Sequence, residues 1–333
     1  MIHDRSRLPG SLSRRRFVQL AGVSGLGLLA GARHPALASD ELASTRVAEG
    51  TWGHIDRLEP GVWAVVSTPL AHDDWMTLCN GGIVAGKERI LVVESFARPE
   101  GARLVAETAR ELTGRWPTDV LVTHYHGDHA NGLEGFAAEG STPTIWMTQT
   151  TRDLVLEADG RREDSPDALR GELLAGASLI GPDGALSMDL GGVSVKLHPR
   201  RGHTASDISV ELDEQGVIFG GDLIWNKIFP NFRDTLPTAL SESVGSLRRE
   251  AETAYVPGHG PLASGTDVTR FVDLIDLVEA AARRAIEGGK SAAQAAAEFR
   301  LPQPLEDWHL FRDNYFEVAI GSWYKELGID PAG

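Results

Sequence analysis

The sequence predicts a layered α/β fold, built from two successive series of strands and helices. Short β-branched runs bounded by glycine, asparagine and lysine indicate strands, and segments with one apolar face indicate helices. The last part of the chain is mostly helical. With 333 residues the chain is long enough for a large core. Hydrophobic residues make up 42% and charged residues 24%, which excludes a disordered chain and a multi-span membrane protein.

The first series follows a polar stretch, residues 39–60, that we expect to be an exposed lead-in segment without a clear period. Apolar residues at helical spacing predict a helix that Gly114 ends, and a second helix precedes a charged loop. The expected strands are 62–66, 82–84, 90–94, 119–123 and 144–147, the helices 99–112 and 149–158, and the loop 159–166.

The second series repeats strands and then ends in helices. Its clearest helix has a core-facing apolar stripe and stops at Gly288 and Gly289. Strands followed by helices, twice over, are typical of packed layers of sheet and helix. The expected strands are 186–190, 193–197, 208–212 and 217–220, and the helices 239–252, 268–287, 292–299 and 307–327.

The first 38 residues are basic, unlike the rest of the chain. They hold six arginines and one acidic residue, a net charge of +5. Because the whole chain has a formal net charge of −15, the residues after 38 carry −20. The run Ser-Arg-Arg-Arg-Phe-Val at 13–18 resembles a twin-arginine signal motif, and the apolar stretch after it is shorter than the ~20 residues of a spanning helix. Ala36-Leu37-Ala38 has the form of a signal-peptidase site.

We therefore expect a twin-arginine signal peptide over 1–38, recognition by the twin-arginine export machinery, and a bacterial periplasmic protein without a stable membrane anchor. A disordered basic N-terminus and an uncleaved anchor are the alternatives. The acidic remainder would repel a phosphate backbone, so no nucleic-acid partner is expected. The single cysteine, Cys79, excludes an intramolecular disulfide and a cysteine-based metal cluster.

A histidine-rich turn directly after an apolar strand carries the strongest chemical signal. It contains His124, His126, Asp128 and His129 within six residues. Residues two apart in an extended backbone point to the same side, so His124 and His126 can coordinate one metal ion. Gly127 then permits a sharp turn, which places Asp128 and His129 for a second metal ion.

Three later segments also place a possible metal ligand beside glycine at the end of a strand. They are Gly202-His203-Thr204, Gly220-Gly221-Asp222 and Pro257-Gly258-His259-Gly260. Each alone is ordinary turn chemistry. Together with the histidine-rich turn, and in this order, they resemble the motifs of the metallo-β-lactamase superfamily over about residues 60–262.

This resemblance implies a four-layer αββα sandwich of the metallo-β-lactamase type, with extra C-terminal helices. The catalytic domain would span 61–264, and 265–333 would be a C-terminal helical extension packed on it. It also implies an enzyme, a metal-dependent hydrolase in which a bridging hydroxide attacks a carbonyl of an ester, thioester, lactone or lactam in a small-molecule substrate.

The resemblance further implies a binuclear site with two divalent metal ions. Nitrogen and oxygen donors favour zinc, and a carboxylate bridge also tolerates iron or manganese. Asp128 would be catalytic by orienting the hydroxide. One ion would take His124, His126 and His203, the other Asp128, His129 and His259, and Asp222 would bridge them.

Other residues are expected around this site. Thr123, Thr204 and Asp207 would fix the orientation of the imidazoles. The substrate-binding candidates are aromatic or polar residues close to the motifs, and Trp75 is expected on a flap. The block 308–316 would either cap the pocket or form a homo-oligomer surface. The substrate-binding candidates are Tyr125, Trp225, Asn226 and Phe229.

Two cues to the substrate conflict. An aspartate at position 222 resembles glyoxalase II-like and lactonase-like hydrolases, whereas export to the periplasm favours a periplasmic metallo-β-lactamase that hydrolyses β-lactams. A metal-retaining binding protein without turnover is the alternative of another class. The sequence therefore predicts hydrolysis at a carbonyl and leaves the type of bond open.

Overall fold

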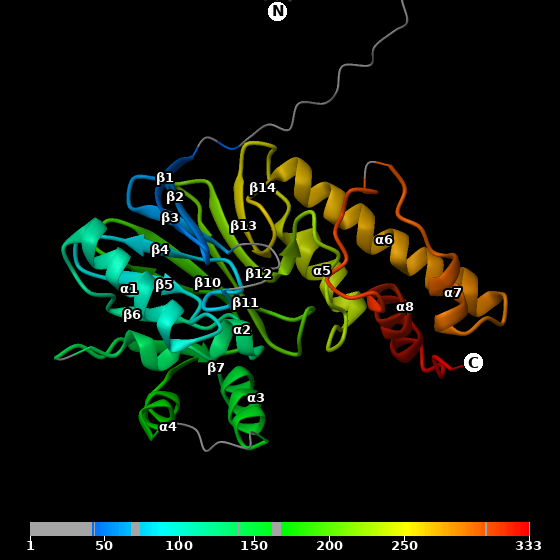
Figure 1. Cartoon of the computed structure of the whole chain (residues 1–333), viewed down its shortest axis with the longest axis horizontal. Helices are drawn as coiled ribbons and strands as arrows, with labels where there is room; N and C mark the ends of the chain where they lie inside the picture. The colour runs from blue at the N-terminus through cyan, green and yellow to red at the C-terminus, as the bar shows by residue number, and fades with distance from the viewer. Residues whose placement is uncertain are drawn as a thin grey trace, which may run out of the picture. The chain divides into compact units, whose positions relative to one another are not determined.

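Two β-sheets lie at the centre of this computed structural model, which describes residues 42, 44–67, 74–138, 140–161, 168–303 and 305–332. The expected signal peptide, 1–38, lies outside the described residues. The first sheet has eight strands in chain order, and the second has six in the order β14-β13-β12-β11-β10-β9 (Figure 1).

The strands of the first sheet are β1 (Thr45–Gly50), β2 (Gly53–Glu59), β3 (Val62–Ser67), β4 (Gly81–Ala85), β5 (Ile90–Val93), β6 (Asp119–Leu121), β7 (Thr144–Thr148) and β8 (Ser178–Ile180). Those of the second are β9 (Leu186–Asp189), β10 (Ser194–Arg200), β11 (Asp207–Leu212), β12 (Val217–Trp225), β13 (Ala254–His259) and β14 (Ala263–Ser264).

Successive side chains of a strand point to opposite faces of the sheet, so each one lies in one of two core layers. In β3, Val62, Ala64 and Val66 face the core between the sheets, where they meet residues of β10, β11 and β12. Trp63 and Val65 point to the opposite face and pack among residues of the first helices. Both faces of the sheet are therefore buried, which explains why the strand is apolar throughout.

Helices cover the outer face of each sheet (Figure 1). The first sheet is covered by α1 (Pro99–Thr113), the short 3-10 helix η1 (Leu133–Phe136), α3 (Gln149–Asp159) and α4 (Ala168–Ala175). The second is covered by α5 (Pro237–Leu247), α6 (Gly265–Glu287), α7 (Ala292–Glu298) and α8 (Tyr315–Glu326). The expected four-layer αββα sandwich is confirmed.

Local sequence signals define the ends of the main helices. Pro99 begins α1, and Gly114 ends it in the left-handed conformation at φ 78°. Ser264 and Asp267 form a capping box at the start of α6, each side chain accepting a backbone N–H of the other. None of the described helices is long and apolar enough to cross a membrane.

The structure differs from the sequence expectation at several elements. The segment 39–60, expected to be a lead-in without regular structure, contains β1 and β2, because β2 pairs with β3 and buries Ile55 in the core. α4 and β8 were not expected, and β12 extends to Trp225 rather than stopping at 220. α8 begins at Tyr315 instead of 307.

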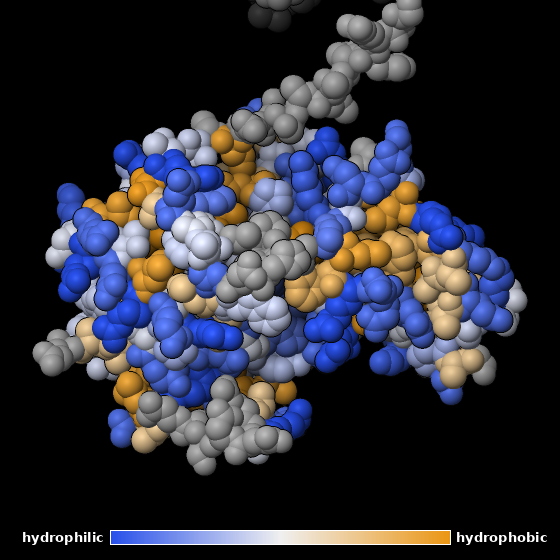
Figure 2. Space-filling model, in the orientation of Figure 1, coloured by the Kyte–Doolittle hydropathy of each residue, from blue (hydrophilic) through white to orange (hydrophobic). Residues whose placement is uncertain are grey.

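The late start of α8 has a visible cause. His309 pairs with the loop after β12, donating its backbone N–H to Lys227 and accepting one from Phe229. Trp308 is buried and stacks on Phe271 of α6, with ring planes 5° apart. These contacts hold the chain around His309 in a parallel β-bridge with Ile228 instead of a helix. On the face shown in Figure 2, hydrophilic residues are spread throughout, with apolar patches between them.

Candidate metal centre

Two strands, and the turns that follow two others, bring the histidines and aspartates of the motifs together. His124 and His126 lie in the turn between β6 and the short helix α2 (Gly127–Ala130), which holds Asp128 and His129. His203 lies between β10 and β11, Asp222 within β12, and His259 at the end of β13. Since β12 and β13 are parallel neighbours, Asp222 and His259 reach the same edge of the sheet.

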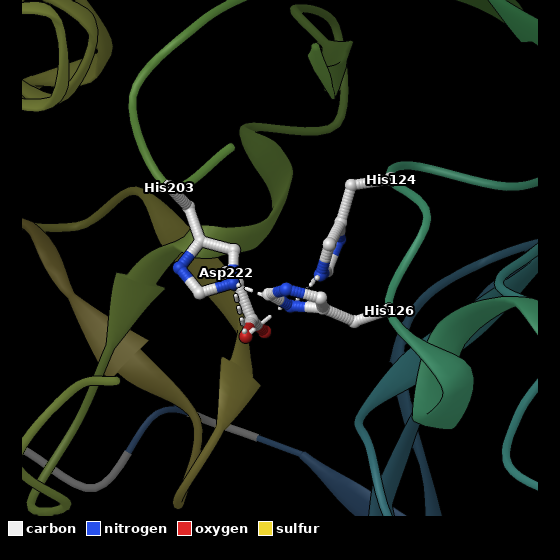
Figure 3. Close-up of side chains that lie close together, drawn as sticks. All are labelled: His124, His126, His203 and Asp222. Atoms are coloured by element: carbon white, nitrogen blue, oxygen red, sulfur yellow. Dashed lines mark hydrogen bonds and ion pairs between the residues drawn. The ribbon is translucent and has the colours of Figure 1, made fainter. Parts of the chain in front are cut away.

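The first cluster comprises His124, His126, His203 and Asp222, whose donor atoms all lie within 4.8 Å of one another. Figure 3 shows the three imidazoles and the carboxylate pointing toward a common centre. His126 Nδ1 lies 3.1 Å from His124 Nε2 and 3.0 Å from His203 Nε2. Nitrogens bound tetrahedrally to zinc would lie about 3.3 Å apart, close to these distances.

The second cluster comprises Asp128, His129 and His259. His259 Nε2 lies 3.1 Å from Asp128 Oδ2, and His129 Nε2 lies 3.6 Å from the same oxygen. These three side chains offer two nitrogens and a carboxylate oxygen, a donor set that divalent zinc, iron or manganese accepts.

Asp222 contacts both clusters, one with each carboxylate oxygen. Oδ2 lies 3.1 Å from His203 Nε2, whereas Oδ1 lies 3.1 Å from His129 Nε2 and 3.4 Å from His259 Nε2. Gly258 permits this position, since a Cβ there would lie 1.9 Å from Oδ1. The carboxylate therefore lies between the clusters, where it can bridge two cations.

The partners behind the histidines determine which ring nitrogens are free. Asp234 accepts a hydrogen bond from His126 Nε2 at 2.9 Å, so Nδ1 of that ring carries a lone pair. Thr123 Oγ1 donates to Glu94 at 2.6 Å and therefore accepts from His124 Nδ1 at 3.1 Å, which leaves His124 Nε2 unprotonated.

These tautomers make two nitrogen lone pairs, His124 Nε2 and His126 Nδ1, face each other at 3.1 Å. Such an arrangement is repulsive unless a cation lies between the nitrogens. In the described part of the chain, the buried atoms His129 Nε2 and Asp222 Oδ1 lie 3.1 Å apart, but neither forms a hydrogen bond of regular geometry. Buried polar atoms are rarely left unsatisfied. The residues therefore fit bound metal ions.

Burial and neighbouring charges set the protonation of the cluster. Burial lowers the pKa of His124 well below its ordinary value, and it lowers the pKa of His203 to about 3 against the attraction of Asp222. Burial also opposes protonation of His259, but the Asp222 and Asp128 carboxylates outweigh it and raise the pKa of His259 to about 9. His124 and His203 are thus neutral imidazoles, and the carboxylates around His259 attract positive charge.

Glu94 is a site residue that sequence analysis missed. It follows β5, is buried, and has a positive φ of 79°. Its Oε1 accepts from Thr123 and lies 3.1 Å from His129 Nδ1, so one carboxylate supports residues of both clusters. An acidic residue ending an otherwise apolar strand was the available signal, because such a residue is seldom buried without a partner.

Asn80 is a second missed residue. Its amide donates to the carbonyls of Pro257 and Gly260, at 2.9 and 2.7 Å, and its Oδ1 accepts from the backbone N–H of Ser67 at 2.8 Å. These bonds hold the chain on both sides of His259. No sequence pattern marks Asn80, since the carbonyls that its amide N–H groups contact lie about 180 residues away.

The residues expected to orient the imidazoles act in two ways. Thr123 contacts the His124 ring directly. Asp207 is buried and accepts from the backbone N–H of Thr204 at 3.0 Å and from its hydroxyl at 2.9 Å. Thr204 and Asp207 thus fix the turn that carries His203, through hydrogen bonds within the turn.

A cavity of about 590 Å³ opens beside the clusters and is lined by Asp128, Asp222 and His259. Of the expected substrate-binding residues, Tyr125 and Trp225 line it, as does Trp75. Trp225 lies against the His259 ring, with centroids 4.3 Å apart.

Asn226 and Phe229 do not line the cavity, which corrects their assignment as substrate contacts. The Asn226 amide is buried and donates to the backbone carbonyls of Pro261 and Leu262. Phe229 is fully buried and packs edge-on against Phe316 of α8. Asn226 thus holds the segment between β13 and β14, and Phe229 stabilises the junction with α8. Proximity to a motif in sequence did not show on which side of the loop they lie.

Comparison with known proteins agrees with this geometry. The chain is 23% identical over 228 residues to a metallo-beta-lactamase type 2 from Bacillus cereus, which covers 66% of this chain and 82% of that protein. It is 30% identical over 133 residues to a hydroxyacylglutathione hydrolase from Rhodopseudomonas palustris, covering 40% of this chain and 43% of that protein.

Solved structures show the same fold. A metallo-beta-lactamase from Erythrobacter litoralis matches with a TM-score of 0.55 and 21% identity, over 69% of this chain and 99% of that one. A sec-alkylsulfatase from a Pseudomonas species matches with a TM-score of 0.63 and 16% identity, over 84% of this chain and 51% of that one. A family model described as the metallo-beta-lactamase superfamily matches residues 76–259, more than half of the chain. The chain therefore belongs to the metallo-beta-lactamase superfamily and is a metal-dependent hydrolase of that family.

Proposed function

We propose that the protein binds two divalent metal ions, most readily zinc, and hydrolyses a carbonyl compound. The observation that carries this proposal is the position of Asp222, whose two carboxylate oxygens each lie 3.1 Å from a histidine of a different cluster. One ion would be held by His124, His126 and His203, the other by Asp128, His129 and His259, with Asp222 shared between them.

Bound divalent ions supply a Lewis acid and an acidified water molecule at neutral pH. The protein supplies position and proton transfer. Asp128 lines the cavity and its carboxylate is partly exposed, so it can orient the attacking water and take its proton. Trp225 donates its indole N–H to the backbone carbonyl of Asp222 at 3.0 Å and thereby fixes the wall beside His259.

The scissile bond is an ester, thioester, lactone or lactam, all of which pass through the same tetrahedral geometry. The hydroxyacylglutathione hydrolase relative supports thioesters, and the Bacillus cereus relative supports β-lactams as the second candidate. A panel of such substrates distinguishes the two candidates, because the preferred bond type is the one hydrolysed with the highest kcat/KM.

Metal content and initial rates on such a panel test the proposal together. We expect two metal ions per chain and turnover of at least one bond class. His124→Ala and Asp222→Asn should each lower kcat/KM by a factor of a hundred or more, whereas His54→Ala, a histidine of β2 outside the clusters, should not. Fewer than one metal ion per chain under metal-replete conditions, or undiminished rates in both variants, would contradict it. A metal-loaded protein inactive on the whole panel would favour a binding role.

We also propose export to the periplasm through the twin-arginine pathway, on the basis of the motif at 13–18. Replacing Arg14 and Arg15 with lysine should leave the protein in the cytoplasm, and Arg5→Lys serves as the control. Cell fractionation measures the outcome. Periplasmic recovery of the double variant would contradict this route.

A further inference from the structure

The cavity beside the metal clusters contains exposed positive charge, although the protein as a whole is acidic. Its lining includes three arginines from separate segments: Arg98 at the start of α1, Arg233 in the loop after β12, and Arg312 just before α8. All three side chains are exposed. Among the described residues, no carboxylate forms an ion pair with any of them.

The carboxylates of the same lining are all engaged. Asp128 and Asp222 contact His129, His203 and His259 within the clusters. Asp234 accepts the hydrogen bond from His126 at 2.9 Å. The charges that remain uncommitted in the cavity are therefore positive, although the chain after residue 38 has a net charge of −20. Unpaired arginines of this kind attract anions to one place on an otherwise repulsive surface.

A tyrosine of the cavity interacts with its arginines. Tyr315 lines the cavity. Burial raises the pKa of Tyr315, while Arg312, through a hydrogen bond and its charge, and Arg233, through its charge, act in the opposite direction. Arg312 is therefore a hydrogen-bond partner of this phenol, and it lines the same cavity as Arg233, where both can attract an anionic oxygen.

The cavity also presents an apolar surface. Trp75 is 51% exposed and Phe311 is 40% exposed, and both line the cavity with Leu78 and Ile228. Large apolar side chains exposed together in a concave site indicate contact with an apolar ligand. The Arg312 guanidinium lies over the Phe311 ring, 5.9 Å from its centroid, so the cationic and apolar surfaces adjoin.

We propose that these features form a specificity subsite for an amphiphilic anion. The substrate would carry a carboxylate, sulfate or phosphate oxyanion bound by Arg98, Arg233 and Arg312, and an apolar chain in contact with Trp75 and Phe311. The inference rests on the proposed hydrolase function and names its substrate class. Arg312 and Phe311 belong to the expected C-terminal extension, which thus contributes directly to the cavity.

Matched esters test the selectivity. para-Nitrophenyl pentanoate and the para-nitrophenyl monoester of glutaric acid share a leaving group and an acyl chain length, but only the second carries a carboxylate. We expect the metal-loaded protein to prefer the anionic ester in kcat/KM by roughly tenfold or more, mainly through KM, as charged hydrogen bonds predict. The double variant Arg233→Gln with Arg312→Gln should abolish this preference.

The matched control is Arg284→Gln, which removes the same charge from an exposed position in the last turn of α6, outside the cavity. It should retain both the preference and the rates. Raising the ionic strength should reduce the preference in the unaltered protein, because salt screens exposed charges. Equal rates for the two esters, or an unchanged preference in the double variant, would overturn the proposal.

Direct binding separates this inference from the proposed function. Hexanesulfonate is an amphiphilic anion whose sulfonate is a weak metal ligand, and calorimetry measures its affinity for the metal-loaded protein. We expect binding that weakens roughly tenfold in the double variant and not in Arg284→Gln. If no ester is hydrolysed but hexanesulfonate binds in this way, the hydrolase proposal fails and the subsite stands. If esters are hydrolysed and hexanesulfonate does not bind, the subsite is wrong.

Discussion

His126 Nε2 lies 2.9 Å from Asp234 Oδ2, and this contact orients the ring so that its Nδ1 faces His124 and His203. Asp234→Ala should weaken metal binding at the first cluster by about 10- to 100-fold, the range for loss of a partner behind a metal-binding histidine. Asp234→Asn should restore part of the affinity, because its amide oxygen can still accept the bond. Competition with a chelating dye measures both. Asp213→Ala, an exposed carboxylate paired with Lys196, should have no effect.

Glu94→Gln should reduce metal retention at both clusters. The carboxylate accepts from Thr123, which supports His124, and lies 3.1 Å from His129 Nδ1. An amide keeps the shape but removes the charge that favours the protonated Nδ1 of His129. We expect about 1–3 kcal/mol lower stability, the cost of a poorly satisfied buried group. Elemental analysis after dialysis, with chemical denaturation, checks both effects. Full metal content in a stable variant would show that Glu94 is not a shared support.

Gly258→Ala should disrupt the centre because the added Cβ would lie 1.9 Å from Asp222 Oδ1. Either the carboxylate or the β13 backbone must shift, and such overpacking typically costs about 1–3 kcal/mol. We expect loss of metal and at least a hundredfold lower kcat. Gly245→Ala in α5 is the control, since nothing lies within 4 Å of its Cβ and alanine favours helix. Metal analysis and thermal unfolding compare the two. Wild-type metal content in Gly258→Ala would refute the close approach.

Removing the metal ions should destabilise the fold as well as abolish turnover. A ligand present at 100 to 1,000 times its Kd stabilises the folded state by about 2.7 to 4.1 kcal/mol, and chelation removes that contribution. The effect should be largest around His124 and His203, where ring nitrogens lie 3.1 and 3.0 Å from His126 Nδ1. Thermal unfolding with and without a chelator measures it, and readdition of zinc should restore the midpoint. An unchanged midpoint in a protein shown to have lost its metal would contradict a structural contribution.

Local patterns predicted much of the fold. β3 and β5 appear as apolar β-branched runs, and the stripe on α6 and Gly114 after α1 gave helices with nearly the observed limits. The elements that the sequence did not predict depend on partners that are distant in the chain. β2 is polar in sequence, yet it is a strand because β3 offers it backbone hydrogen bonds. The segment before α8 is helical in pattern, but its backbone pairs with the loop after β12 instead.

For the site, too, local patterns predicted some residues and distant contacts decided the others. The sequence by itself determined which histidines and aspartates form the clusters, because ligands beside glycine at strand ends form a pattern readable along the chain. Tertiary structure alone decided that Glu94 and Asn80 support the clusters. It also decided that Asn226 and Phe229 lie outside the cavity lining, and that three arginines, Arg98, Arg233 and Arg312, line the cavity together. These relations join residues far apart in sequence, and the packing of sheets and helices, not local propensity, sets which side chains share a space.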